Sequence, residues 1–138
     1  MSKYLLFFLA VSAFGQGQVG GVQQGASGGG AISPVPIALT DGATISTNAA
    51  LGNSFKVTLG GNRALAAPTN PTDGQKAMWI FVQDGTGSRT IALNSVFTFG
   101  TDVTGCVLST TASKTDYLGA VYNAANTAWN VVSCAKGY

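Results

Sequence analysis

The sequence contains no histidine and no glutamate, so its whole supply of carboxylate side chains is five aspartates. Without histidine, the usual catalytic triads and most zinc sites cannot be built. General acid–base catalysis is also poorly supplied, because each aspartate stands in a predicted turn or at a predicted strand end. These absences predict a protein that is not an enzyme and that binds no cofactor and no metal. The aspartates are Asp41, Asp73, Asp84, Asp102 and Asp116.

Charge of either sign is scarce, since charged residues make up 9% of the chain and the net charge is +2. The seven Lys and Arg residues are scattered singly, with no basic cluster that could follow a phosphate backbone. We therefore expect no nucleic-acid binding. A surface poor in charge and rich in Thr, Asn and Gly is typical of a protein that works in an assembly or outside the cell.

A hydrophobic segment long enough to span a membrane is missing as well. The apolar run at residues 4–14 would cover, at ~1.5 Å per residue, about half of a ~30 Å hydrocarbon core, so no stable membrane span is predicted. Lys3 precedes the run, and Ala13 and Gly15 supply small residues at signal-peptidase spacing. Residues 1–15 are therefore predicted to be an export signal. The alternative is an uncleaved hydrophobic segment that docks the subunit onto a larger particle.

Cysteine occurs twice, and both cysteines fall in predicted strands or strand edges. In an exported chain, a disulfide between Cys106 and Cys134 is the economical interpretation, and it would add roughly 3 kcal/mol of stability. In a reducing cytosol the same residues would be two buried free thiols. With the signal-like segment, the disulfide predicts an extracellular location.

Glycine and glutamine dominate residues 16–30, which carry almost no bulky side chains. Such a segment buries too little apolar area to offset the entropy of ordering it, so it is predicted to be a flexible linker. Residues 31–138 form the predicted folded domain. Its lead-in contains Pro34 and Pro36, which favour extended backbone.

The folded part alternates short apolar runs with turn residues at a period of two. Phe55, Val57 and Leu59 share one predicted strand face, while residues 77–82 are continuously apolar, as in a central strand covered on both faces. About seven to eight short strands are expected, and no repeat of solenoid period is visible. The predicted fold is all-β, a small antiparallel sandwich or jelly-roll-like domain.

Two hairpins are predicted from turn chemistry. Residues 84–87 (DGTG) would join the strand at 77–82 to a partner at 89–93. Residues 123–126 (NAAN) would join strands at 117–122 and 128–134, because asparagine tolerates the positive φ that hairpin loops need. Trp129 is expected to fill the core opposite a strand of the first hairpin.

Five short motifs in residues 41–138 resemble, in the same order, those of a β domain at the C-terminal ends of phage tail-fibre and other minor virion structural proteins. The motifs are residues 59–65 (LGGNRAL), 68–71 (PTNP), 73–75 (DGQ), 82–90 (VQDGTGSRT) and 114–117 (KTDY), the last followed by Tyr122 and Trp129.

This resemblance implies a structural or host-facing part of a virion, often trimeric, with no chemistry of its own. It adds the virion surface to the predicted locations. The chain departs from the family pattern at residues 97–100 (FTFG), where a tryptophan and a glycine pair are usual, and in its cysteine pair and signal-like N-terminus. Those departures leave open a secreted cellular protein.

Four aromatic residues are the candidate ligand-facing side chains: Trp79, Trp129, Tyr117 and Tyr122. Exposed aromatic rings are the usual means by which a neutral module holds sugars. Core packing is the alternative, and it is favoured because all four lie inside apolar runs. Asp116 is expected to pair with Arg89 or Arg63 across the sheet.

Two functions follow from these observations. The first is a structural or assembly module of a virion appendage or a secreted filament or spike, which self-associates through β surfaces into a trimer or filament. The second is a recognition module that binds a glycan or a cell-surface receptor, with residues 16–30 as its tether.

Overall fold

The computed structural model describes residues 35–138, which form nine β-strands and one short turn of 3-10 helix, Ala49–Leu51. The predicted export signal at residues 1–15, the linker at 16–30 and the start of the domain at residue 31 lie outside the described residues. The strands are β1 (Ile37–Ala38), β2 (Thr44–Ile45), β3 (Ser54–Leu59), β4 (Arg63–Leu65), β5 (Lys76–Gln83), β6 (Ile91–Leu93), β7 (Phe97–Phe99), β8 (Thr115–Asn123) and β9 (Ala128–Ala135).

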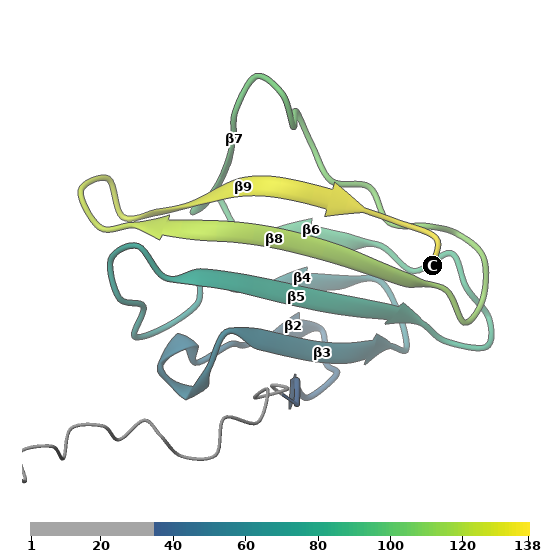
Figure 1. Ribbon diagram of the computed structural model, residues 1–138. Coiled ribbons are helices and arrows are strands. Elements are labelled where there is room, and N and C mark those ends of the chain that lie inside the picture. Colours follow the sequence, from purple (N-terminus) through teal and green to yellow (C-terminus); the bar gives the residue numbers. More distant parts are fainter. Residues whose placement is uncertain (1–34) are drawn as a thin grey trace, which may run out of the picture. The chain divides into compact units, whose positions relative to one another are not determined.

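These strands make two sheets packed face to face. The larger has the order β1-β3-β5-β8-β9-β7, and the smaller has the order β2-β4-β6. In Figure 1 the smaller sheet lies behind the larger one, which is seen from its outer side. The predicted all-β fold with two layers is confirmed.

The first six strands wind as a parallel coil, because the chain crosses from one sheet to the other after every strand. In the large sheet Ile37 pairs with Phe55, and Phe55 pairs with Trp79, all in parallel register. In the small sheet Thr44 pairs with Ala64, and Ala64 with Ala92, also in parallel. All the pairs among these six strands are therefore parallel, where antiparallel pairs were expected.

The C-terminal half closes the large sheet with antiparallel pairs. Strand β8 runs antiparallel to both β5 and β9, and the short β7 lies parallel to the far side of β9. The predicted β8–β9 hairpin is present, with its turn at residues 124–127 and the amide of Ala125 bonded to the side chain of Asn123. The positive φ of this turn is at Thr127 (+52°) and not at an asparagine, so that part of the expectation is wrong. One bulge interrupts the hairpin between Gly119 and Ala120.

The predicted hairpin at residues 84–87 is wrong. Strand β6 belongs to the small sheet, and the antiparallel neighbour of β5 is β8, so the DGTG segment is a corner between the sheets. Gly87 has a φ of +74°, which favours glycine, and the Asp84 carboxylate accepts hydrogen bonds from the amides of Thr86 and Gly87. The same turn chemistry thus serves a different connection.

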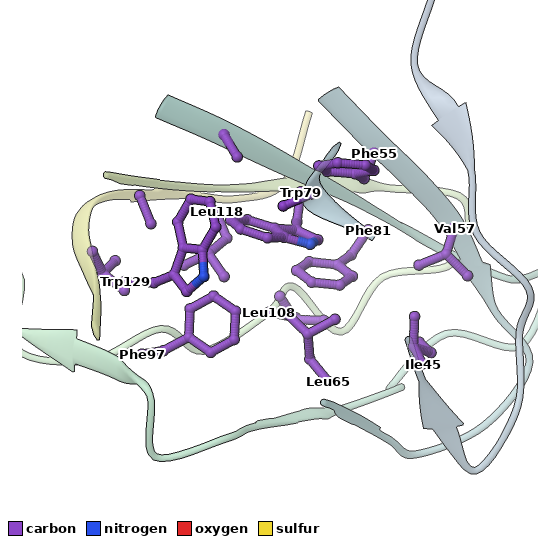
Figure 2. Close-up of a cluster of buried hydrophobic side chains, with 14 of the residues drawn as sticks. Ile45, Phe55, Val57, Leu65, Trp79, Phe81, Phe97, Leu108, Leu118 and Trp129 are labelled. Carbon is purple, nitrogen blue, oxygen red and sulfur yellow. The ribbon is translucent and has the colours of Figure 1, made fainter. Parts of the chain in front are cut away.

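The core lies between the two sheets and follows the predicted period of two. Phe55, Val57 and Leu59 are buried, while Lys56 and Thr58 on the opposite side of β3 are exposed. In Figure 2 the rings of Phe55, Trp79, Phe81, Phe97 and Trp129 gather with aliphatic side chains from both sheets. Figure 2 labels the aliphatic members Ile45, Val57, Leu65, Leu108 and Leu118.

The long connection between β7 and β8, residues 100–114, has no regular secondary structure, and its part from Cys106 onward is attached to the rest of the domain. Leu108 inserts into the core, and the carbonyl of Thr110 accepts a hydrogen bond from the amide of Ser88. Gly87 also lies against this connection, since a Cβ there would stand 2.5 Å from the Thr110 carbonyl oxygen. The connection therefore packs as part of the domain.

Candidate functional site

The two candidate tryptophans lie in the core. Trp79 and Trp129 are 0% and 1% exposed, and their rings meet edge to face with centroids 5.2 Å apart (Figure 2). The indole nitrogen of Trp79 donates a hydrogen bond of 3.0 Å to the hydroxyl of Thr47, whereas that of Trp129 has no acceptor within residues 35–138. The core-packing interpretation is confirmed for both residues, and Trp129 packs against β5 as expected.

The two candidate tyrosines point to opposite faces of β8. Tyr122 faces inward and packs on Trp129, with ring centroids 5.2 Å apart. Tyr117 pairs across the sheet with Ile80 on the outer face, and its ring lies 5.6 Å from that of Tyr138. The four aromatic side chains therefore do not form one ligand platform, and Tyr117 is the member that faces outward.

Cys106 and Cys134 form a disulfide, with Cα atoms 5.5 Å apart. Cys106 lies in the long β7–β8 connection and Cys134 on β9, so the bond fastens that connection to the hairpin. A bridge of this kind indicates an oxidising environment, as expected for an exported protein.

Two aspartates hold arginines at corners of the coil. Arg63 contacts Asp41 at 2.7 Å, and Arg89 contacts Asp84 at 2.7 Å. The hydrogen bonds from Arg63 lower the pKa of Asp41 below its usual value. The hydrogen bonds from Arg89 lower the pKa of Asp84 to about 2, with a further contribution from the backbone amides of the turn. Both carboxylates are therefore ionised at neutral pH.

Asp116 does not pair with an arginine, so that expectation is wrong. Its side chain is 0% exposed on the inner face of β8 and accepts hydrogen bonds from the amide and hydroxyl of Ser109 and from the amide of Gly137. Three donors replace the water that the carboxylate loses. The residue thereby ties the β7–β8 connection and the segment after β9 to the same strand.

Glutamines hold two further corners. The amide nitrogen of Gln75 donates to the carbonyls of Ala49 and Gly52 and to the side chain of Asn53. Gln83 is 1% exposed and exchanges two hydrogen bonds with the backbone of Arg89. These two glutamines thus bind backbone groups of neighbouring turns of the coil and hold them together.

The other two aspartates, Asp73 and Asp102, share no hydrogen-bond partner. Asp73 accepts a hydrogen bond from the amide of Ala124, and Asp102 accepts one from the hydroxyl of Thr101. Within residues 35–138, no three cysteine or acidic side chains group so that they could hold a metal ion. The same residues include no helix with the length and apolar character of a membrane span.

The outer face of the large sheet carries apolar side chains where water contact would favour polar ones. Sequence reasoning expected residues 77–82 to be covered on both sides, but Met78, Ile80 and Val82 are only half-buried and face away from the small sheet. No other segment of residues 35–138 crosses this face (Figure 1). We call the apolar set on it the outer apolar face: Met78, Ile80, Val82, Tyr117, Val121, Val132 and Tyr138.

A hollow of about 330 Å³ lies within the outer apolar face, beside Gly119. Met78, Val121 and Val132 line it, and a Cβ on Gly119 would stand 2.5 Å from the hydroxyl of Ser133. Val132 sits at the bulge of β9 and is 58% exposed. The apolar residues of β5 were visible in the sequence, whereas the hollow depends on the pairing of β8 with β9.

A second hollow, of about 390 Å³, opens at the first coil, where β1 and β2 are the edge strands of their sheets. Its walls combine the apolar Ile37, Leu39 and Leu51 with the hydroxyls of Thr44 and Ser46. Its lining contains no charged side chain. The composition suits a neutral partner that offers both apolar and hydroxyl groups.

Comparison with known proteins gives no relative: no family model, no curated protein and no solved structure matches this chain.

Proposed function

We propose that this protein is a non-enzymatic structural module of an extracellular assembly, either a virion surface appendage or a secreted filament or spike. It associates with copies of itself through its β surfaces. The observation that carries the proposal is the outer apolar face, which residues 35–138 leave uncovered. Contiguous apolar surface on a folded domain marks sites of protein association.

The use of polar side chains supports a structural role. Asp41, Asp84 and Asp116 each hold a corner or a connection of the fold, and Gln75 and Gln83 do the same. A catalytic residue, in contrast, needs a side chain directed at a substrate. The chain has no histidine and no glutamate to add to this inventory.

The proposed location rests on three features. The Cys106–Cys134 disulfide favours an oxidising compartment or the outside of the cell. The motif resemblance in residues 41–138 favours the virion surface, and the signal-like residues 1–15 favour secretion. Both alternatives place the domain in an extracellular assembly.

The proposal is tested by the mass of the full-length protein in solution. Protein purified with its disulfide intact would be examined by sedimentation velocity over a concentration series into the high micromolar range. We expect a mass above that of one chain, rising with concentration. A protein that stays a strict monomer over the whole series contradicts the proposal.

The hollow at the first coil supports a second candidate function, recognition of a neutral glycan or receptor. Apolar side chains can contact the faces of sugar rings while hydroxyls exchange hydrogen bonds with the sugar. A glycan array with the full-length protein should give a binder that is lost in Leu51→Asp, where Leu51 lines the hollow, and kept in Val107→Asp, where Val107 does not. An array without a binder, or a binder equally retained by both variants, rejects glycan recognition at this site.

A further inference from the structure

The outer apolar face has a shape that two copies of the chain can share. Its middle combines a hollow beside Gly119 with a projecting side chain, Val132, at the edge of the same hollow. A two-fold axis through this point would bring the Val132 of each copy toward the hollow of the other. Such a self-complementary patch is what a two-fold contact requires.

We infer that two copies pack their large sheets face to face, with the Val132 side chain of each copy in the Gly119 hollow of the other. The inference rests on the proposed self-association and names the surface that performs it. The hollow of about 330 Å³ opens broadly onto the outer side of the large sheet, so a side chain of a second copy can reach it. The glycine keeps the hollow open, because a side chain at position 119 would collide with Ser133.

The size of the face is sufficient for a specific contact. The outer apolar face, together with the adjoining polar outer side of β3, spans the four neighbouring strands β3, β5, β8 and β9; these cover roughly 19 Å by 26 Å at ordinary strand spacing and rise, which is about 500 Å² for each copy. The pair would bury roughly 1,000 Å² in total, at the lower limit for specific interfaces. We therefore expect a dimer that dissociates on dilution.

The charges of the face do not favour a second copy, so the contact depends on the shape and apolar character of the face. Lys56 and Lys76 lie on the outer side of β3 and β5, and neither forms an ion pair within residues 35–138. No carboxylate shares this side of the four strands: Asp116 is the aspartate on them, and it faces the core. Lys76 is one of the residues that line the hollow, so the like charges of two copies oppose the contact and apolar burial must drive it. Added salt should leave the dimer unchanged or strengthen it.

The decisive variants place a charge at the centre of the contact. Val132→Asp should weaken the dimer by at least about 30-fold, the change that corresponds to a ~2 kcal/mol central residue. Val107→Asp is the matched control, because Val107 is 73% exposed on the β7–β8 connection and lies outside the outer apolar face. Circular dichroism and the melting temperature would show that both variants keep the fold.

A mixing experiment tests the two-fold geometry itself. Val132→Asp and Val132→Lys should each be monomeric alone, and an equimolar mixture should regain association, because a two-fold contact brings the two positions together. Association by Val132→Asp equal to that of the wild type would reject this surface while leaving the proposed self-association in place. A monomeric wild type would reject both, and a mixture that stays monomeric or a dimer weakened by salt would reject the face-to-face arrangement.

Discussion

Ser109 binds the buried carboxylate of Asp116 twice, through its amide nitrogen at 3.1 Å and its hydroxyl oxygen at 2.9 Å. Together with the Gly137 amide, these bonds hold two separate segments on strand β8. Asp116 faces the core and so takes no part in the outer apolar face. They explain how a long connection without regular structure stays attached.

We expect Asp116→Ala to lower the free energy of unfolding by about 2–4 kcal/mol, because it leaves buried donors without an acceptor. Urea denaturation followed by tryptophan fluorescence would measure the change. Asp102→Ala is the matched control: Asp102 is exposed and accepts a hydrogen bond from the neighbouring Thr101 hydroxyl, and its loss should cost less than about 0.5 kcal/mol. Equal effects of the two substitutions would contradict the anchoring role.

The disulfide should stabilise the domain chiefly by restricting the unfolded chain. Replacing both Cys106 and Cys134 by serine is expected to cost about 3 kcal/mol for a closed loop of 28 residues. Thermal and urea unfolding of the double variant and the wild type would measure this difference. Wild-type protein that is unfolded in denaturant without a reducing agent and then alkylated should carry no labelled cysteine. Labelling of both cysteines would refute the bond.

Acid should destabilise the domain through Asp84. Its pKa is held at about 2 in the folded protein, against 3.8 as the ordinary value, so the folded state binds fewer protons between these two values. The contribution of the ion pair is complete above pH 4 and is lost as the pH falls toward 2. Asp84→Asn and Arg89→Gln should both reduce the dependence of the free energy of unfolding on pH between pH 4 and 2. Part of the dependence that remains comes from Asp41, whose pKa is also lowered. Urea titrations at successive pH values would show an unchanged slope if the pair contributes nothing.

Gly87 and Gly85 occupy the same corner but should respond differently to alanine. Gly87 has a φ of +74°, and a Cβ there would meet the carbonyl of Thr110 and the amide of Ala112, so Gly87→Ala should cost at least about 1–3 kcal/mol. Gly85 has open space around it, and Gly85→Ala should change stability by less than about 0.5 kcal/mol. Denaturation of the two variants compares them directly, and similar stabilities would contradict the close packing of this corner against the β7–β8 connection.

Local features of the fold were predictable from the sequence. The alternation of Phe55, Val57 and Leu59 with exposed residues depends only on the two-residue period of a strand. The β8–β9 hairpin depends on a short asparagine-containing turn between adjacent strands. In both cases neighbouring residues determine the structure.

The parallel coil was not predictable by the same means. Its paired residues are 18 and 24 positions apart in the large sheet and 20 and 28 apart in the small sheet, so the coils have no common length that would show as a repeat. Turn chemistry does not show whether the next strand returns to the same sheet or crosses to the other. The DGTG corner illustrates this limit.

The candidate site was predictable in part. Tyr117 and Tyr122 are five positions apart on one strand, and an odd separation places them on opposite faces, so their lack of a shared platform follows from strand geometry alone. The apolar run of β5 indicated that its outer side chains need a cover. Residues 35–138 do not supply this cover. The sequence could not show this, because it depends on where all the other strands lie.

The unequal attachment of its two ends gives the domain a mechanical polarity. A pulling force transmitted through the chain at Val35 acts first on β1, a two-residue strand that can peel from β3 a few hydrogen bonds at a time. A force at Tyr138 instead meets two hydrogen bonds to Thr115, the Gly137–Asp116 contact and then the disulfide at Cys134. In single-molecule stretching, the segment next to Val35 should therefore detach from the domain at a lower force than the segment next to Tyr138.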